Sequence, residues 1–283
     1  MPLTRRKFLS VLATLGAGSA ATAGYARWIE PHHLEVTTRR VPLVPAKPRP
    51  VLRVLQLSDF HASPVVPLEL IARSIELGLA RKPDLIALTG DFITTAYDRF
   101  GDYARLLARL SAAAPTFACP GNHDGGSWAR RSGGYATLEP VRALLNGAGI
   151  LFLENAWHAL TVAGRPVQVV GVGDFWSRAC FPAAVFPRLP ERQEATRIVL
   201  NHNPDAKELF RKHDWDLMLC GHTHGGQLRL PLLGAPFAPV VDKRYVEGLH
   251  PWAGRWLHIT RGVGNLHGVR FNCPPEVSVL EVT

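Results

Sequence analysis

Residues 51–61 read VLRVLQLSDFH, and this stretch decides the fold class. Its apolar part, 51–58, has the length and composition of a buried strand, and Asp59 and His61 follow directly. Further along the chain, short apolar runs alternate with stretches of helical periodicity, which is typical of an α/β layer architecture. We expect strands at 51–58, 84–89, 115–119, 149–153, 167–172, 197–201, 215–220, 256–260 and 277–281.

Helices are expected between several of these strands, because apolar residues recur there every three or four positions. Two such faces are formed by Leu68, Ile71, Ile75 and Leu79, and by Tyr103, Leu106, Leu107 and Leu110. Pro67 suits the first turn of the first helix. Pro204 is expected to open a further helix that runs through Lys212.

Residue types that bind metal or phosphate follow four more of the predicted strands. These loops contain Gly90-Asp91, Gly121-Asn122-His123-Asp124, His202-Asn203-Pro204 and Gly221-His222-Thr223-His224. Ligands of open α/β sheets bind beyond the carboxyl ends of strands, so the loops can converge on one point. Nitrogen and oxygen donors without thiolate suit Mn, Fe or Zn, and the sequence does not choose among them. Two such ions would activate water for phosphoester hydrolysis.

The ordered series Asp59-x-His61, Gly90-Asp91, Gly121-Asn122-His123-Asp124, His202 and Gly221-His222-x-His224 resembles the calcineurin-like metallophosphoesterases. The C-terminal half is similar to the exported YkuE/YaeI-like branch of that family. The motifs that carry this likeness are His202-Asn203-Pro204-Asp205, Gly225-Gly226-Gln227, Tyr245-Val246-Glu247-Gly248, Arg261-Gly262-Val263-Gly264 and Arg270-Phe271-Asn272-Cys273-Pro274-Pro275-Glu276. The resemblance implies a four-layer α/β/β/α sandwich.

The resemblance also implies a role for each motif residue. One divalent ion would be held by Asp59, His61, Asp91 and His224, and the other by Asp91, Asn122, His202 and His222. Asp91 would bridge the two ions, and a metal-bridging hydroxide would be the nucleophile. His123 would contact the phosphate or protonate the leaving group, a role that suits histidine at neutral pH.

The sequence departs from the family pattern at one position. Many relatives have an aspartate three residues after the bridging one, where it is thought to orient the catalytic histidine, but this chain has Thr94. Asp124 is the candidate to replace it. Trp176, Phe175, Trp252 and Trp256 are expected in the core rather than at the substrate. Cys119 and Cys220 are expected to be buried free thiols.

The N-terminus has the pattern of an export signal. Residues 4–10, TRRKFLS, and the uncharged run that follows to Ala23 resemble a twin-arginine signal, and Ala21-Thr22-Ala23 suits signal peptidase. The run is short for a spanning helix, so we expect cleavage; an uncleaved segment would anchor the protein to the membrane. We therefore expect a signal peptide at 1–23, a proline-rich lead-in at 24–50, a metallophosphoesterase domain at 51–283, and a periplasmic or secreted protein.

The composition limits the class of protein and its partners. With 47% hydrophobic and 19% charged residues, the 283-residue chain is a folded protein rather than a disordered or multi-span one. Its net charge of +9 favours anionic partners such as phosphate esters, and leaves a membrane surface open as a partner. It lacks the spacings of RNA-binding and zinc-finger motifs, so nucleic acid is not expected.

Three functions remain in competition. The first is a metal-dependent phosphoesterase, expected to be a phosphodiesterase, that acts on a small molecule or an envelope component. The second is a hydrolase similar to UDP-2,3-diacylglucosamine pyrophosphatase, which export disfavours because that substrate is made on the cytoplasmic face. The third is a catalytically silent metal-binding envelope protein, which the complete ligand set disfavours.

Overall fold

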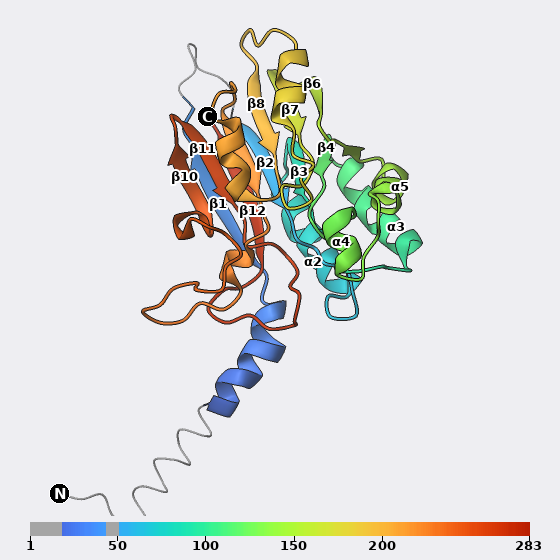
Figure 1. Ribbon diagram of the computed structural model, residues 1–283, viewed down its shortest axis with the longest axis vertical. Helices are drawn as coiled ribbons and strands as arrows, with labels where there is room; N and C mark the ends of the chain where they lie inside the picture. The colour runs from blue at the N-terminus through green and yellow to red at the C-terminus, as the bar shows by residue number, and fades with distance from the viewer. Residues whose placement is uncertain (1–18, 44–50) are drawn as a thin grey trace, which may run out of the picture.

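Two six-stranded sheets form the centre of the molecule (Figure 1). The structure is a computed structural model that describes residues 19–43 and 51–283. In order across the first sheet lie β1 (Glu35–Val41), β12 (Glu276–Val282), β2 (Leu52–Leu57), β3 (Leu85–Thr89), β4 (Thr116–Cys119) and β5 (Leu151–Phe152). Strands β2 to β5 are parallel, and β12 runs antiparallel to β2.

The second sheet repeats this mostly parallel arrangement. Its order is β10 (Gly248–Trp252), β11 (Arg255–Ile259), β9 (Leu217–Cys220), β8 (Thr196–Leu200), β7 (Arg165–Gly171) and β6 (Ala156–Val162). The four middle strands are parallel, and the edge strands β6 and β10 are antiparallel to their neighbours.

Side chains alternate between the two faces of each strand and so build separate cores. In β2, Leu55 and Leu57 pack under the helices of the first sheet, whereas Leu52 and Val54 face the second sheet. Leu200 and Leu219 of the second sheet meet them in the layer between the sheets. A third core lies on the outer face of the second sheet.

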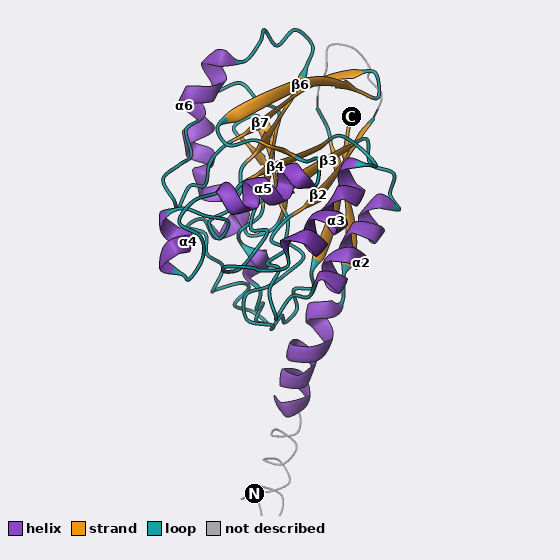
Figure 2. Ribbon diagram, turned by 90° about the vertical axis from the view of Figure 1, so that its right-hand side faces the viewer, coloured by secondary structure: helices purple, strands orange, loops and turns teal. Residues whose placement is uncertain are grey.

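Helices cover the outer faces of both sheets (Figures 1 and 2). The helices α2 (Leu68–Leu79), α3 (Phe100–Ser111) and α5 (Glu139–Gly147) pack on the first sheet. The short helices α6 (Pro182–Val185), η3 (Phe186–Arg188) and η4 (Pro204–Phe210) pack on the second. Further short helices are α4 (Ser127–Arg131), η5 (His224–Gly226) and η6 (Lys243–Tyr245). The expected four-layer α/β/β/α sandwich is confirmed.

Every predicted strand is present, and three further strands were not predicted. β6 and β10 are edge strands, and β1 lies inside the predicted proline-rich lead-in. β1 pairs in parallel with β12 from Glu35↔Glu276 to Val41↔Val282, so the sheet begins before residue 51. The segment that Pro204 opens is a 3₁₀ helix that ends at Phe210, with Asn203 as its cap, rather than a helix through Lys212.

A helix leads into β1 from the N-terminal side. Residues 19–24 are helical, and the helix continues through the π-helical turn η1 (Tyr25–Ile29) and the 3₁₀ turn η2 (Glu30–His32). Residues 1–18 of the predicted signal and residues 44–50 of the predicted lead-in lie outside the described residues. Within the described residues, none of the helices is long and apolar enough to cross a membrane.

Candidate metal centre

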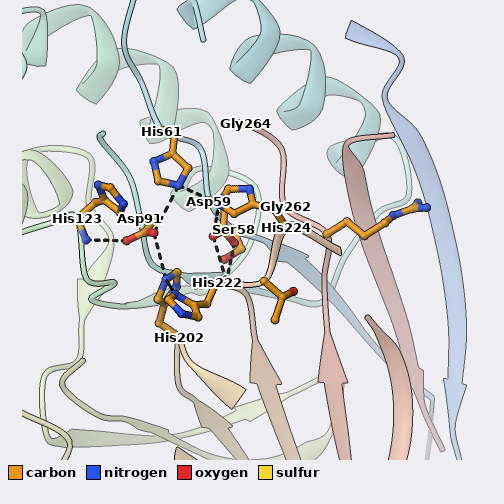
Figure 3. Close-up of polar contacts among 12 residues, drawn as sticks. Ser58, Asp59, His61, Asp91, His123, His202, His222, His224, Gly262 and Gly264 are labelled. Atoms are coloured by element: carbon orange, nitrogen blue, oxygen red, sulfur yellow. Dashed lines mark hydrogen bonds and ion pairs between the residues drawn. The ribbon is translucent and has the colours of Figure 1, made fainter. Parts of the chain in front are cut away.

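The polar loops after five strands meet at one end of the two sheets (Figure 3). The first sheet supplies the loops after β2, β3 and β4, and the second supplies those after β8 and β9. All the predicted site residues come together there, and none is more than 6% exposed: Asp59, His61, Asp91, Asn122, His123, His202, His222 and His224. The sequence therefore located every member of this buried cluster.

Five of the seven predicted ligands have a left-handed backbone. The φ angle is 52° at Asp59, 50° at His61, 56° at Asp91, 71° at His222 and 50° at His224. For residues with a Cβ this conformation costs about 1–2 kcal/mol each. Strain that gathers at one point is typical of functional sites, and here each turn aims a side chain at the same space.

One group of donors consists of Asp59, His61 and His224. The His61 and His224 Nε2 atoms are 3.2 Å apart, and His224 Nε2 lies 3.4 Å from Asp59 Oδ1. His61 Nε2 is also 3.4 Å from Asp91 Oδ2. These atoms match the ligand set that the resemblance implies for the first ion.

The second group shares Asp91 with the first. His202 Nε2 lies 3.1 Å from Asp91 Oδ2 and 3.3 Å from His222 Nδ1. His222 Nδ1 is in turn 2.9 Å from Asn122 Oδ1. The same Asp91 oxygen therefore faces both groups, as a bridging ligand would.

The spacing of these atoms fits divalent cations. Donors bound at about 2.0–2.2 Å with angles between square and tetrahedral lie roughly 3.0–3.5 Å from one another. Most of the separations above fall in that range. The individual ligand roles and the identity of the metal stay predictions.

Burial prepares most of these imidazoles for binding metal. It lowers the pKa of His61 to about 3, and it lowers the pKa of His222 and His224 well below the usual value. A neutral imidazole offers the lone pair that a cation needs. Burial also opposes charge on His202, but the Asp91 carboxylate outweighs it and raises the pKa of His202 to about 10. A cation at this point would compete with that proton.

His123 is oriented by the backbone. Its Nδ1 donates to the Thr94 carbonyl at 2.7 Å, and its own N–H donates to Asp91 Oδ1 at 2.9 Å. The hypothesis that Asp124 orients His123 is wrong, because both Asp124 oxygens face backbone N–H groups. They accept from Asp91, Phe92 and Gly121 at 2.7–2.9 Å. Asp124 thus holds two site loops together.

Close backbone contacts explain the glycines of two motifs. A Cβ at Gly121 would lie 2.2 Å from Asp91 Oδ1, and one at Gly221 would lie 2.3 Å from Asp59 Oδ2. The buried Arg270 guanidinium secures a third loop by donating to the carbonyls of Arg261, Gly262 and Gly264. The resemblance included Arg270, but without a role.

Two tryptophans stand beside the predicted ligands and the predicted acid. The ring centroid of Trp128, on α4, lies 4.5 Å from that of His123. The ring centroid of Trp176 lies 4.2 Å from that of His222. The two indoles are 5.8 Å apart, and both are half-buried. Both Trp176 and Trp252 were expected in the core. Trp252 lies there, but Trp176 lies beside the site instead. Sequence reasoning did not single out Trp128.

Comparison with known proteins decides the family. The model of the calcineurin-like phosphoesterases matches residues 52–226, which include every predicted site residue. The chain belongs to this family. It is therefore a metal-dependent hydrolase of phosphoric esters, and the His and Asp groups described above could hold the divalent ions that the family uses.

Several relatives match nearly the whole chain. Phosphodiesterase YaeI of Escherichia coli is 44% identical, with 99% of each chain covered. The uncharacterized metallophosphoesterase YkuE of Bacillus subtilis is 32% identical, covering 98% of this chain and 96% of its own. UDP-2,3-diacylglucosamine pyrophosphatase LpxG of Chlamydia muridarum is 27% identical, covering 96% and 98%.

A solved structure shares the fold. The 5'-nucleotidase precursor of Thermus thermophilus superposes with a TM-score of 0.51 at 14% sequence identity. The match covers 82% of this chain and 55% of the longer one. It supports the architecture alone.

Proposed function

We propose that this protein is an exported phosphodiesterase that uses two divalent ions, Mn among the candidates, to hydrolyse a small-molecule or envelope phosphodiester. The observation that carries the proposal is the pair of donor groups that share Asp91, with His123 beside them. The 44% identity to a protein named phosphodiesterase supports the choice of a diester.

Seven side chains of the protein would hold the two ions. Asp59, His61, Asp91 and His224 would hold one ion, and Asp91, Asn122, His202 and His222 the other. When bound, such a pair of ions supplies an activated water and neutralises the charge of the phosphate. Because Asp91 is fixed by the His123 N–H and by Asp124 through its own N–H, both halves of the site keep one geometry.

His123 would move the proton. Its Nδ1 proton is engaged by the Thr94 carbonyl, so the proton that reaches the leaving oxygen is the one on Nε2. Trp128 flanks the same ring and would pack against the leaving group. The two half-buried indoles thus favour a substrate with an apolar or planar part near the phosphate.

Export through the twin-arginine machinery to the periplasm or beyond is part of the proposal. Arg5 and Arg6 precede the uncharged run, and export of a folded protein would let the metal centre assemble before transport. Retention of residues 1–23 would leave the protein anchored to the membrane. Cell fractionation with a map of the N-terminal peptide tests both points.

The enzymatic proposal is tested with bis-p-nitrophenyl phosphate. We expect Mn-stimulated hydrolysis by the purified protein, with two ions per chain by elemental analysis. Asp91→Asn and His222→Ala should abolish turnover and lower the metal content. Asp98→Asn and His158→Ala change exposed residues of the same types and should leave both unchanged. Absence of turnover on every phosphate ester, with metal bound, would support the silent envelope protein instead.

A second candidate substrate is UDP-2,3-diacylglucosamine, since a relative 27% identical over nearly the whole chain is named for its pyrophosphatase activity. A screen of metal-loaded protein against phosphomonoesters, phosphodiesters and nucleotide-sugar pyrophosphates separates the candidates. Preference for the lipid-linked pyrophosphate, together with retention on the cytoplasmic side, would favour this alternative.

A further inference from the structure

An uncharged loop projects from the end of the molecule that carries the site (Figure 1). Residues 230–241 read LPLLGAPFAPVV and contain no polar side chain. Four large apolar side chains of this loop lie in solvent, and we call them the apolar tip: Leu232 (106% exposed), Leu233 (71%), Phe237 (68%) and Val241 (88%). Large apolar side chains exposed together on one loop are candidates for an interaction surface.

The tip is built into a defined turn. Leu230 and Gly234 exchange backbone hydrogen bonds of 2.8 and 2.9 Å, which place Leu232 and Leu233 at the outermost point. Leu232 has a left-handed backbone with φ of 67°, an unfavourable conformation for leucine. The turn thus holds Leu232 in a strained backbone conformation and leaves two leucines exposed. Burial of these leucines against a partner would offset the free-energy cost of the strain and of the exposure.

The base of the loop is fixed next to the metal centre. Ala238 and Val240 are buried against Val246 in a small core of their own. Gly226, two residues after the ligand candidate His224, approaches Ala235 so closely that a Cβ there would lie 2.4 Å from the Ala235 Cβ. The tip is therefore a firm extension of a site loop.

The N-terminal helix extends from the same end of the molecule (Figures 1 and 2). Trp28 is 71% exposed and Ile29 is 58% exposed. The Ala26 carbonyl accepts from the Arg270 N–H, and the adjacent Phe271 carbonyl accepts from the Arg229 N–H where the loop begins. A short hydrogen-bonded chain of segments thus joins the helix to the loop.

We propose that the apolar tip and the exposed face of this helix insert into the surface of a lipid bilayer with anionic headgroups. The tip offers no side-chain hydrogen bonds, which fits hydrocarbon better than a protein partner, and Trp28 suits the interface. Arg27 and Lys243 donate to the carbonyls of Gly268 and Ala238, so these contacts leave their positive charges available to headgroups.

A protein that retains residues 1–23 would have a second apolar segment beside the helix. Residues 8–18 contain no charged residue and precede the helix that carries Trp28 in the sequence. Docking would bring the metal centre close to the headgroup layer. If the proposed phosphodiesterase function holds, the site would then reach phosphate esters that lie at the bilayer surface.

The test places a fluorescent reporter on the tip. All four natural cysteines are buried, so Leu233→Cys in the full chain provides an accessible thiol for an environment-sensitive label. The matched control is Leu151→Cys, on the strand at the opposite edge of the first sheet from β1, where Leu151 is 42% exposed. Both proteins are mixed with vesicles of phosphatidylcholine, alone or with phosphatidylglycerol.

We expect the label at position 233 to shift its emission to the blue and to become protected from aqueous iodide, more strongly with phosphatidylglycerol. The label at position 151 should stay exposed. A label at 233 that stays exposed while the protein sediments with vesicles would overturn the proposal. A shift without vesicles that grows with protein concentration would also overturn it and indicate a second copy as the occupant. The readout is independent of turnover, so it can fail or succeed separately from the phosphodiesterase assay.

Discussion

At the scale of single residues, His123 shows how the chain compensates for its departure from the family pattern. Where many relatives are thought to use a carboxylate, the Thr94 carbonyl accepts the Nδ1 proton at 2.7 Å. A carbonyl accepts but cannot donate, so it keeps the Nδ1 proton on the ring and fixes the ring orientation. Nε2 is therefore the ring nitrogen left to exchange a proton with the leaving group.

Replacement of His123 should depend on the leaving group. We expect His123→Asn to lower kcat about 10²–10⁴-fold on an alkyl phosphodiester, because the alkoxide must be protonated as it leaves. The loss should be much smaller with p-nitrophenolate, which leaves without a proton. Metal content should stay at the wild-type value. Equal losses on both substrates would contradict the general-acid role.

The motifs located every residue of the buried cluster, because loops after parallel strands must end at the same edge of a sheet. They did not reveal the Thr94 carbonyl, since any residue type at position 94 supplies one. They also assigned Asp124 wrongly, because its hydrogen bonds go to the backbone of loops distant in sequence. Contacts of this kind depend on the packing of loops, which periodicity does not encode.

At the scale of the elements, a buried polar contact links the two sheets. Gln56 of β2 accepts from His258 Nδ1 of β11 at 2.7 Å and donates to the Cys220 carbonyl of β9 at 2.9 Å. Burial lowers the pKa of His258 to about 4. His258 is therefore neutral in the folded protein at pH values where the unfolded chain already binds a proton.

This contact should make stability depend on pH. The pKa of His258 is lower in the folded protein than in the unfolded chain. Its contribution to the free energy of unfolding is therefore complete above about pH 6.5 and is lost as the pH falls toward 4. Urea unfolding across this range should show a shallower loss for His258→Asn, which keeps a donor but does not titrate. His158→Asn, on the exposed face of β6, should keep the wild-type slope. Identical slopes in all three proteins would refute the assignment.

The edge strand β1 shows where local sequence was insufficient. Its sequence, EVTTRRV, is mostly exposed or half-buried and lies among prolines, so it lacks the apolar run that identified the central strands. Its strand conformation comes from pairing with β12, more than two hundred residues later. Such a partner is invisible to a reading of neighbouring residues.

Truncation should therefore show whether the folded domain begins at residue 51, as predicted, or includes β1. A chain that begins at residue 51 would leave the β12 edge unpaired along seven residues, an arrangement prone to aggregation. We expect that chain to be insoluble or to unfold at lower urea. A chain that begins at residue 24 keeps β1 and should unfold like the full protein. Equal stability of the two would show that β1 contributes little.

At the scale of the whole molecule, removal of metal should be visible as lost stability. An ion present at a hundred times its dissociation constant stabilises the folded state by about 2.7 kcal/mol. For a chain of this size that corresponds to a decrease in Tm of roughly 5–10 °C for each ion that chelation removes. Differential scanning calorimetry with and without EDTA measures it. Asp91→Asn, which weakens both groups of donors, should respond far less.

The origin of the donors has a mechanical consequence. Asp59, His61, Asp91 and Asn122 lie in loops that follow strands of one sheet, whereas His202, His222 and His224 follow strands of the other. Each predicted ion would therefore cross-link the two layers and resist any sliding of one against the other. Amides in the interior layer should exchange with deuterium more slowly when metal is bound.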